Sequence, residues 1–462
     1  MPNETPKIVL QNEKLSGWSN FPDSRSRVLR PTDISEINIP HLRSIKNAII
    51  ARGSGRSYGD ASLNSGRITV SSDRLDSVTE FDDKKGILTC ETGMTIEDTL
   101  KMIVPRGWFL PVVPGTQYPT LGGCFACDVH GKNHHVSGTF SLHTRWIELL
   151  TATGETVRCS QRKNKDIFQA TAGGLGLTGI ITKISINLIP VQSANIYEKL
   201  LPSSNLEKSM NLLSKYDEEW LYSVAWLDCI NDRNALGKGI VYLGKHADQE
   251  MISPDQSINS GLSGWKSKQF TIPFTPPVSL VSKINIGLYN RWRYFNGNLQ
   301  SKDHTYHYSG FFFPLDRLRK WNRLYGKSGF IQYQFMVPFD SGYKVISRIL
   351  GMAHARGNPP LLAVLKRFGK GAGLLSFPMP GWTLAIDLPL RAGVLSMLDE
   401  MDRIVLDHGG RVYLAKDARL SSIMFRKMYP EYHKWLEIKR KIDPENIFTS
   451  DLSRRLRIDE EE

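Results

Sequence analysis

The amino-acid sequence predicts an α+β fold with more than one domain. Its 462 residues are enough for two or three hydrophobic cores, and 40% hydrophobic with 23% charged residues is an ordinary globular composition. Short β-branched runs, broken by glycine and polar turns, fill the region from Lys46 to about Pro190, with helical patterns between some of them. After Pro190 the loops lengthen and most of the tryptophans and tyrosines are found. A second domain is therefore expected there.

The individual elements follow from local periodicity. In the first region, β-branched runs predict strands at 47–51, 67–72, 86–91, 145–157 and 178–190. The helical pattern in that region lies at 95–107. In the second region, strand-like pieces lie at 330–338 and 382–390. The tail is expected to be helical at 397–410 and 433–448, and the last helix should end before its proline-containing turn.

Charge and cysteine content restrict the class of protein. Five cysteines in a chain of this length are sparse and odd in number, which favours reduced thiols over a disulfide framework. The N-terminus has no signal-peptide pattern, and no window approaches about 18 uninterrupted apolar residues. We therefore expect a soluble or peripheral protein made in the cytoplasm. The net charge of +13 favours anionic partners.

The positive charge is concentrated between Arg291 and Lys327, where aromatic residues interleave the basic ones. One interpretation is a solvated helix face with Phe311 to Phe313 in the core. A second is a surface for phospholipid head groups or a lipid phosphate. No recognisable nucleic-acid module accompanies the basic residues, so no nucleic-acid partner is expected.

Two glycine clusters match dinucleotide fingerprints superficially. "GLGLTG", Gly174 to Gly179, fits G-x-G-x-x-G, but a strand-like run follows it where a Rossmann unit needs a helix. Rossmann binding is therefore rejected. In "ARGSGRSYGD", Ala51 to Asp60, glycines can aim successive backbone N–H groups at an anion such as a diphosphate. A tight hairpin is the alternative for this loop.

The stretch "GGCFACDVHGKNHH", Gly122 to His135, raises the alternative of a zinc hydrolase or deaminase. Against zinc, the sequence has no second C-x-x-C, no H-E-x-x-H and no H-x-E partner for a P-C-x-x-C pattern. No metal is expected. The glycines of this segment add a further backbone loop, and several such loops suit a long ligand held largely by main chain.

Together, "ARGSGRSYGD", "PGTQYPTLGG", "CDVHGKNHH", "GGLGLTGII" and "GGRVYLAKD" resemble flavoproteins of the vanillyl-alcohol-oxidase (PCMH-type) family, and most closely the decaprenylphosphoryl-β-D-ribose 2-oxidases. The resemblance runs from about Gly17 to Arg457. It implies a two-part FAD-binding domain made of residues 1–192 and 406–462, with an inserted substrate domain, 193–405, built on an antiparallel sheet.

The resemblance also implies the residues that contact FAD. The first loop would cradle the pyrophosphate, the second would line the adenine and ribitol path, and the third would run beside the isoalloxazine together with Tyr413. The implied contacts are Arg52, Gly53, Ser54, Gly55, Arg56, Ser57, Tyr58, Gly59, Asp60, Gly115, Thr120, Leu121, Gly122, Gly123, Cys127, His130, Gly131, Lys132, Asn133, His134, Val136, Ile181 and Tyr413. Arg56 replaces the histidine through which many relatives attach FAD covalently, so non-covalent FAD is expected.

Lys416 is the first candidate for the group that takes the proton of the reacting hydroxyl, because a desolvated lysine can have a lowered pKa. A salt bridge to neighbouring Asp417 or to another acid is its structural alternative. Tyr58 and His130 are the other catalytic candidates, Tyr58 alternatively being a buried wall.

Four further residues are candidates for the substrate. Lys132 would attract a substrate phosphate or else be a surface charge, and Lys366 is a second phosphate candidate. Gln332 and Gln334 lie two apart on a predicted strand and so share a face, which suits sugar hydroxyls or solvent.

The expected function is FAD-dependent oxidation of the 2-hydroxyl of a polyprenyl-phosphate-linked ribofuranose to a 2-keto sugar, the first half of an epimerisation to arabinose for cell-wall arabinan. A separate short-chain dehydrogenase would complete it, and peripheral contact with the inner face of the plasma membrane is expected for a lipid-linked substrate. The resemblance leaves open another sugar or alditol, because Thr383 and Ala385 stand where close relatives commonly have asparagine and cysteine. A non-catalytic basic binding protein is the remaining alternative.

Overall fold

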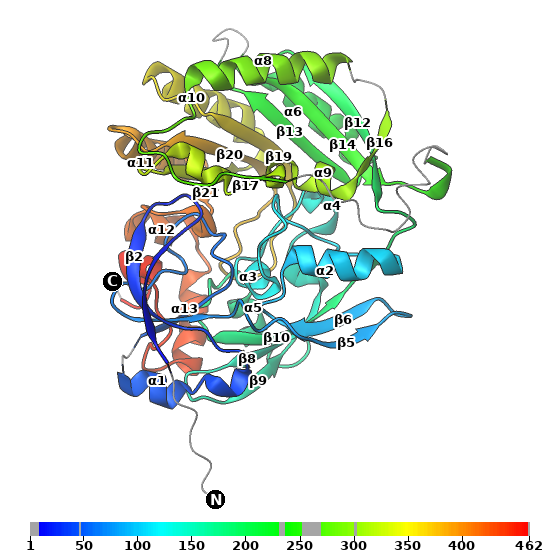
Figure 1. The fold of residues 1–462 in the computed structure, drawn as a ribbon. Coiled ribbons are helices and arrows are strands. Elements are labelled where there is room, and N and C mark those ends of the chain that lie inside the picture. Colours follow the sequence, from blue (N-terminus) through cyan, green and yellow to red (C-terminus); the bar gives the residue numbers. More distant parts are fainter. Residues whose placement is uncertain (1–8, 46–47, 231–235, 252–268, 300–302, 461–462) are drawn as a thin grey trace, which may run out of the picture.

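The computed structural model describes residues 9–45, 48–230, 236–251, 269–299 and 303–460. Segments far apart in the sequence share its lower half in Figure 1, where the blue and cyan N-terminal strands lie beside the red C-terminal helices. The green to orange residues form a large sheet in the upper half. Helices and antiparallel sheets are thus mixed as an α+β fold requires.

The lower half contains two sheets. In the four-stranded sheet, ordered β1-β2-β4-β3, the strand β4 pairs in parallel with both β2 and β3. The five-stranded sheet, ordered β5-β6-β10-β8-β9, is antiparallel throughout. The bounds are β1 Gln11–Ser16, β2 Asp23–Leu29, β3 Ile49–Arg52, β4 Ile68–Ser71, β5 Val78–Asp82, β6 Ile87–Glu91, β8 Thr144–Leu150, β9 Thr156–Cys159 and β10 Ile180–Asn187.

The upper half is one eight-stranded antiparallel sheet in the order β16-β12-β14-β13-β19-β20-β18-β21. Its strands are β12 Asn195–Ser203, β13 Tyr222–Asp228, β14 Lys238–His246, β16 His304–His307, β18 Phe330–Val337, β19 Leu362–Phe368, β20 Gly381–Pro389 and β21 Arg411–Val412. Two short pairs complete the strands: β7 Trp108–Phe109 with β11 Ile189–Pro190, and β15 Phe270–Thr271 with β17 Leu318–Arg319.

The two faces of the large sheet have different surroundings. Successive side chains of a strand point to opposite faces. On β18, Ile331, Tyr333 and Phe335 enter the largest hydrophobic core, whereas Gln332 and Gln334 line a cavity on the other face. The helices α6 Leu206–Tyr216, α10 Gly342–Ala355 and α11 Val394–Asp407 contribute buried residues to that core. The helix α8 Lys283–Leu299 contacts β12 and β14.

The remaining helices are short and border the lower sheets and the cavity. They are α1 Ile39–Ile45, α2 Ile96–Ile103, α3 Leu121–Ala126, α4 His134–Ser137, α5 Lys165–Thr171, α9 Tyr308–Phe312, α12 Ser422–Met428, α13 Tyr432–Ile442 and α14 Asp451–Arg455. Thr95 caps α2, and its hydroxyl accepts a hydrogen bond from the Asp98 N–H. The helix α13 ends before Pro444, as its sequence predicts.

The C-terminal segment is tied to the N-terminal sheet. The Thr449 N–H donates to the Ile49 carbonyl at 3.1 Å. The Arg455 guanidinium donates to both carboxylate oxygens of Asp60 at 2.8 Å and to Asp417 at 2.8 Å. One cation therefore joins the first glycine loop, the segment after β21 and the last helix.

Most predicted elements are present, with one alternative overturned. The strands at 330–338 and 382–390 and the helices at 95–107, 397–410 and 433–448 are confirmed with shifted ends. The hairpin alternative for the first glycine loop is wrong, because β3 and β4 are parallel neighbours. Phe311 to Phe313 are buried, as one of the two interpretations of the basic segment holds. Within the described ranges, no helix is long and apolar enough to cross a membrane.

Replacing Arg455 by Met should lower the free energy of unfolding by about 3–5 kcal/mol, because it leaves the buried carboxylates of Asp60 and Asp417 unpaired. Urea unfolding measures this. The matched control is Arg457→Met, which removes a largely exposed ion pair to Glu460 and should change stability by about 0.5 kcal/mol or less. Equal unfolding curves for the two variants would contradict the assigned role of Arg455.

Candidate functional site

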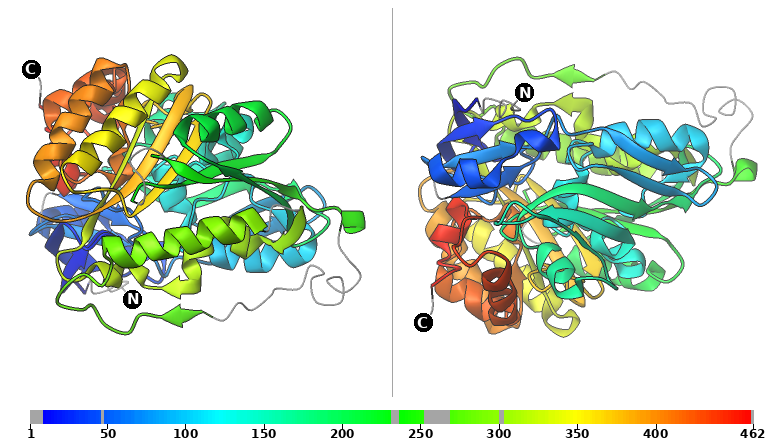
Figure 2. Two further views of the ribbon diagram at one scale, coloured as in Figure 1. Left: turned by 90° about the horizontal axis from the view of Figure 1, so that it is seen from above. Right: turned by 90° about the horizontal axis from the view of Figure 1, so that it is seen from below.

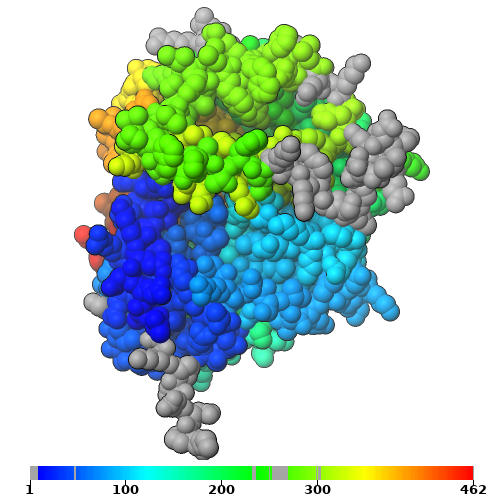
Figure 3. Space-filling view, viewed as in Figure 1, coloured from blue at the N-terminus to red at the C-terminus, as the bar shows by residue number. Residues whose placement is uncertain are grey.

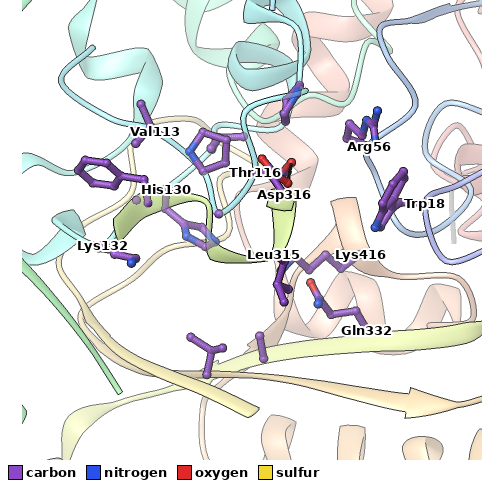
Figure 4. A pocket seen from close by; sticks show the side chains of 18 of the residues that line it. Trp18, Arg56, Val113, Thr116, His130, Lys132, Leu315, Asp316, Gln332 and Lys416 are labelled. Carbon is purple, nitrogen blue, oxygen red and sulfur yellow. Dashed lines mark hydrogen bonds between the residues drawn. The ribbon is translucent and has the colours of Figure 1, made fainter. Parts of the chain in front are cut away.

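A cavity of about 1120 Å³ lies between the glycine loops of the lower half and one face of the eight-stranded sheet. Figure 4 shows Arg56 and Trp18 on one side of it, His130 and Lys132 on another, and Gln332 close to Lys416. Small-molecule pockets usually occupy about 300–1,000 Å³. This cavity therefore has room for a long ligand together with part of a second one.

The large sheet supplies a polar patch on the cavity wall. Gln332 and Gln334 face the cavity, as their spacing predicts, and Thr383, Ala385 and Lys366 come from the adjoining strands β20 and β19. The Gln334 amide donates to the Thr383 hydroxyl at 3.1 Å. The side-chain carbonyl oxygens of both glutamines are buried without a hydrogen-bond partner among the described residues. Both amides can therefore still accept a hydrogen bond from a ligand.

His130 is held in one orientation between aromatic rings. Its ring lies 4.5 Å from the Phe368 ring and 5.4 Å from the Tyr413 ring, centroid to centroid. The Gln334 amide nitrogen lies 3.2 Å from His130 Nε2 and donates to it, which places the proton of a neutral ring on Nδ1. Burial holds the pKa of His130 well below its usual value, and the positive charge of Lys366 lowers it further. The Nδ1–H of the neutral ring has no hydrogen-bond partner among the described residues.

Three lysines line this one cavity. Burial lowers the pKa of Lys132 to about 7 and that of Lys366 to about 8. Burial also lowers the pKa of Lys416; repulsion from Lys366 adds to this effect, and the Asp387 carboxylate opposes it. An anionic ligand would raise these pKa values and hold the amines protonated, whereas an empty or neutral surrounding favours the free amine.

Tyr58 and Asp387 surround Lys416. The Lys416 ammonium nitrogen lies 5.3 Å from the centre of the Tyr58 ring. Asp387 is fully buried on β20, and one of its oxygens accepts from the Gln332 amide at 2.6 Å. Burial raises the pKa of Asp387. Lys416 has no ion pair with neighbouring Asp417, because Arg455 pairs with that carboxylate. The salt-bridge alternative for Lys416 is therefore wrong for Asp417, whereas its other form, an interaction with another acid, is met in part by the Asp387 carboxylate.

The first glycine loop approaches the other loops too closely for side chains. A Cβ on Gly53 would lie 2.2 Å from the Thr120 hydroxyl oxygen. Gly55 has φ +65°, which favours glycine. The Ser54 hydroxyl donates to the Tyr118 carbonyl at 2.6 Å. Backbone atoms of this loop can therefore reach a ligand that side chains would exclude.

Trp18 and Asp316 also line the cavity, and both were missed from the sequence because no motif marks them. The Arg56 guanidinium carbon lies 4.2 Å from the Trp18 ring centre and 4.7 Å from the Tyr118 ring centre. Asp316 accepts from the Gln117 N–H and the Thr116 hydroxyl, both at 2.8 Å, and burial raises its pKa to about 6. The Nε of Arg56 is buried with no hydrogen-bond partner in the described part of the chain. This arginine is thus positioned to meet an anion.

Seven predicted FAD contacts do not lie on the cavity wall. Asp60 pairs with Arg455, and Asn133 donates to the Pro111 carbonyl at 2.8 Å. The His134 Nδ1 accepts from the Gly369 N–H at 3.0 Å. The seven predicted contacts that lie off the wall are Arg52, Gly59, Asp60, Leu121, Asn133, His134 and Val136. Val136 is 59% exposed, and Leu121 lies in a hydrophobic core. The other predicted contacts line the cavity, including Gly115, Thr120, Gly122, Gly123, Cys127, Gly131, Ile181 and Tyr413.

The cysteine and histidine segment serves as part of the wall. Cys124 is fully buried, and burial raises its thiol pKa well above the usual value. The Cys127 sulfur lies 3.9 Å from the Ser57 hydroxyl, and the Cys127 carbonyl accepts from the Tyr413 hydroxyl at 2.8 Å. Within the described ranges, no group of three or more His, Cys, Asp or Glu side chains is arranged to hold a metal.

These features fit FAD. The glycine loops give an extended backbone surface, the unpaired Arg56 Nε suits a diphosphate, and the unpaired amide and imidazole groups suit a polar ring system. The loop "GGLGLTGII", Gly173 to Ile181, adds Leu175, Gly176 and Gly179 to the same wall. FAD would be held by residues from both ends of the chain.

Comparisons with known proteins agree with this fit. A family model described as an FAD binding domain matches residues 27–160, and one for D-arabinono-1,4-lactone oxidase matches residues 387–456. The chain is 34% identical to decaprenylphosphoryl-β-D-ribose oxidase of Mycolicibacterium smegmatis, over 98% of this chain and 99% of the relative. It is 23% identical to L-gulonolactone oxidase of Mus musculus, over 91% and 92% of the two chains.

Replacing Gly53 by Ala should reduce bound flavin roughly tenfold at limiting FAD, because the new Cβ forces the loop away from Thr120. The measurement is the flavin released into the supernatant by acid precipitation, per mole of protein. Wild type should release its full content, as expected of non-covalent FAD. Gly351→Ala is the control, since its Cβ meets no atom within 4 Å. Normal flavin content in Gly53→Ala would contradict this account of the loop.

Proposed function

Since this chain belongs to the FAD-dependent oxidoreductase family that includes decaprenylphosphoryl-β-D-ribose oxidase, we propose that it oxidises the 2-hydroxyl of a polyprenyl-phosphate-linked ribofuranose to a 2-keto sugar. That it is an oxidoreductase with FAD as cofactor follows from the family itself. The substrate is the proposal. We also propose that a separate short-chain dehydrogenase completes the epimerisation.

The observation that carries the proposal is the meeting of three lysines, each withdrawn from bulk water, in one cavity. Asp387 faces Lys416 and Glu198 acts on Lys132, but a neutral sugar would leave Lys366 without an anionic partner in a place that disfavours unpaired charge. A phosphate diester linking a sugar to a lipid supplies that anion. Lys132 and Lys366 would bind the phosphate, and the amides of Gln332 and Gln334 would bind the sugar hydroxyls.

The proton of the reacting hydroxyl needs an acceptor. When bound, FAD would supply the acceptor for the hydride of the carbinol carbon. Lys416 has a lowered pKa and lies beside Tyr58, so its free amine can accept the hydroxyl proton. Asp387 then stabilises the ammonium group that results. The His130 Nδ1–H can donate to a bound group, while its neutral ring carries no charge that would repel the lysines.

The wider organisation follows the same proposal. Residues 1–192 and 406–462 would form the FAD-binding part, and the sheet within 193–405 would bind the substrate. The ties between Ile49 and Thr449 and between Asp60 and Arg455 support this division. Arg56 cannot form the covalent flavin bond of a histidine, so FAD would be held non-covalently. The enzyme would work at the cytoplasmic face of the membrane, where a lipid-linked substrate is found.

A second candidate is oxidation of another sugar or alditol by the same chemistry. Thr383 and Ala385 lie on the cavity wall, where they would touch the sugar, and both depart from the residues expected in close relatives. Thr383 offers a hydroxyl in place of an amide, and Ala385 is smaller than cysteine, so the two would admit a different ring. The proposed phosphate site distinguishes the two candidates, because a neutral alditol makes no use of Lys366.

The pH dependence of kcat/KM with polyprenylphosphoryl ribose tests the role of Lys416. Activity should rise with pH, because the free amine forms as pH increases, along a limb with an apparent pKa well below the ordinary lysine value of about 10.4. Lys416→Met should lower kcat by about 10²–10⁴-fold with flavin retained. Asp387→Asn removes a carboxylate that raises this pKa, so the limb should move to lower pH. An unmoved limb would contradict the assignment.

Replacing Lys366 by Met should lower kcat/KM for the phosphate-linked sugar by about 10–100-fold, mainly through KM, because one charge-assisted hydrogen bond to phosphate is lost. Lys344→Met, at an exposed position of α10, is the control for the loss of one positive charge. Steady-state kinetics on both variants measure the effect. If Lys366→Met and Lys344→Met behave alike, the phosphate site is not where we place it.

A further inference from the structure

The helix α8 exposes its apolar side. Ile284, Leu288, Trp292, Phe295 and Leu299 follow each other at intervals of three or four residues, so they form one stripe along the helix. Their exposed fractions are 78%, 62%, 60%, 61% and 65%. Figure 2, left, shows α8 lying outside the large sheet, and in Figure 3 the corresponding green surface is open to solvent at the top of the molecule.

Polar contacts fix this orientation from below. The Asn290 amide donates to Asp228 at 2.9 Å, and the Arg293 guanidinium donates to the Tyr242 hydroxyl at 3.0 and 3.1 Å. Gly297 lies so close to Ile240 that a Cβ there would be 2.3 Å from its terminal methyl group. A helix on a water-facing surface normally turns its apolar side inward. The helix α8 instead leaves most of its large apolar side chains exposed, and these polar contacts help to hold it in that orientation.

The segment before α8 extends the same apolar character. Its exposed large hydrophobic residues are Phe270, Phe274, Val278 and Leu280, at 54–70% exposure. Its backbone is nevertheless held in place, since the Ile272 N–H donates to the Arg319 carbonyl at 3.0 Å and the Leu280 N–H to the Leu324 carbonyl at 2.8 Å. Exposed apolar groups in such numbers mark an interaction surface on a soluble protein.

We propose that α8 and residues 270–280 form a face that docks onto an anionic phospholipid bilayer, with the α8 stripe entering the head-group region. Between residues 269 and 299 the sequence has no Asp or Glu, whereas Lys283, Arg291 and Arg293 are basic, and Lys283 and Arg291 are exposed. An apolar stripe with Trp and Phe, flanked by basic residues, is the composition of helices that lie in the plane of a membrane. Residues 300–302, inside the basic segment, lie outside the described residues.

The docking face is continuous with the cavity. Tyr289, Trp292 and Leu299 of α8 line the cavity and are also exposed to solvent. Behind them the wall is apolar, with Leu200, Trp226, Ile240, Leu362 and Val364. A ligand with a hydrocarbon chain could therefore pass from the bilayer to the polar patch without crossing water. The docking inference goes beyond the proposed reaction, since the contact depends on α8 and not on which sugar is oxidised.

The test is co-sedimentation of the FAD-loaded full chain with vesicles of phosphatidylcholine alone and with added phosphatidylglycerol. Wild type should bind the anionic vesicles more tightly. Ile284→Gln with Leu288→Gln should lower the vesicle partition coefficient roughly tenfold or more, because two side chains lose apolar burial in the interface. The control is Val78→Gln with Ile423→Gln, which alters two exposed apolar residues elsewhere and should bind as wild type does.

Three results would overturn the docking proposal. They are no binding to either vesicle, equal binding by the α8 variant and wild type, or a wild-type dimer that the α8 substitutions convert to monomer without any vesicle binding. Light scattering gives the oligomeric state. Neither substituted α8 residue lines the cavity, so flavin content and turnover of a detergent-dispersed substrate should remain unchanged. Failure of vesicle binding with normal turnover would leave the proposed reaction standing.

Discussion

The fold depends on the close crossing of the first glycine loop and the segment that follows β21. A Cβ on Gly59 would lie 1.6 Å from the Asp417 carbonyl oxygen, so only glycine permits this approach. The Tyr58 N–H donates to the Ala415 carbonyl at 3.1 Å, more than 350 residues away in the chain. Arg455 forms ion pairs with both crossing segments, with Asp60 of the glycine loop and with Asp417 of the segment after β21. This crossing places Tyr58 beside Lys416.

The crossing closes one end of a cavity whose opposite wall is the eight-stranded sheet. Because side chains alternate across that sheet, the same strands that bury a hydrophobic core on one face present glutamines, a lysine and a threonine on the other. Separation from bulk water then lowers the pKa of each cavity lysine. The electrostatic character of the site is thus a consequence of how the sheet is covered, and it suits both proton removal and anion binding.

The sequence predicts what is local and misses what depends on distant contacts. Periodicity was enough for most strands and helices, and the spacing of Gln332 and Gln334 was enough to put both on one face. Asp316 and Asp387 carry no motif, and only the fold brings Asp316 to the cavity wall and Asp387 behind Gln332. The parallel pairing of β3 with β4 was not expected from a glycine-rich turn. For α8, the basic residues indicated an exposed surface. Only the hydrogen bond from the Asn290 amide to Asp228 shows which side of the helix faces the sheet and which side faces outward.

The most direct test of the central claim is anaerobic mixing of the purified, FAD-loaded protein with polyprenylphosphoryl ribose while the visible absorbance of oxidised flavin is followed. We predict rapid bleaching with the phosphate-linked sugar and little or none with the same ribofuranoside lacking the phosphate, because the cavity lysines need an anion. Bleaching at equal rates by the two compounds, or faster bleaching by a neutral alditol, would contradict the account.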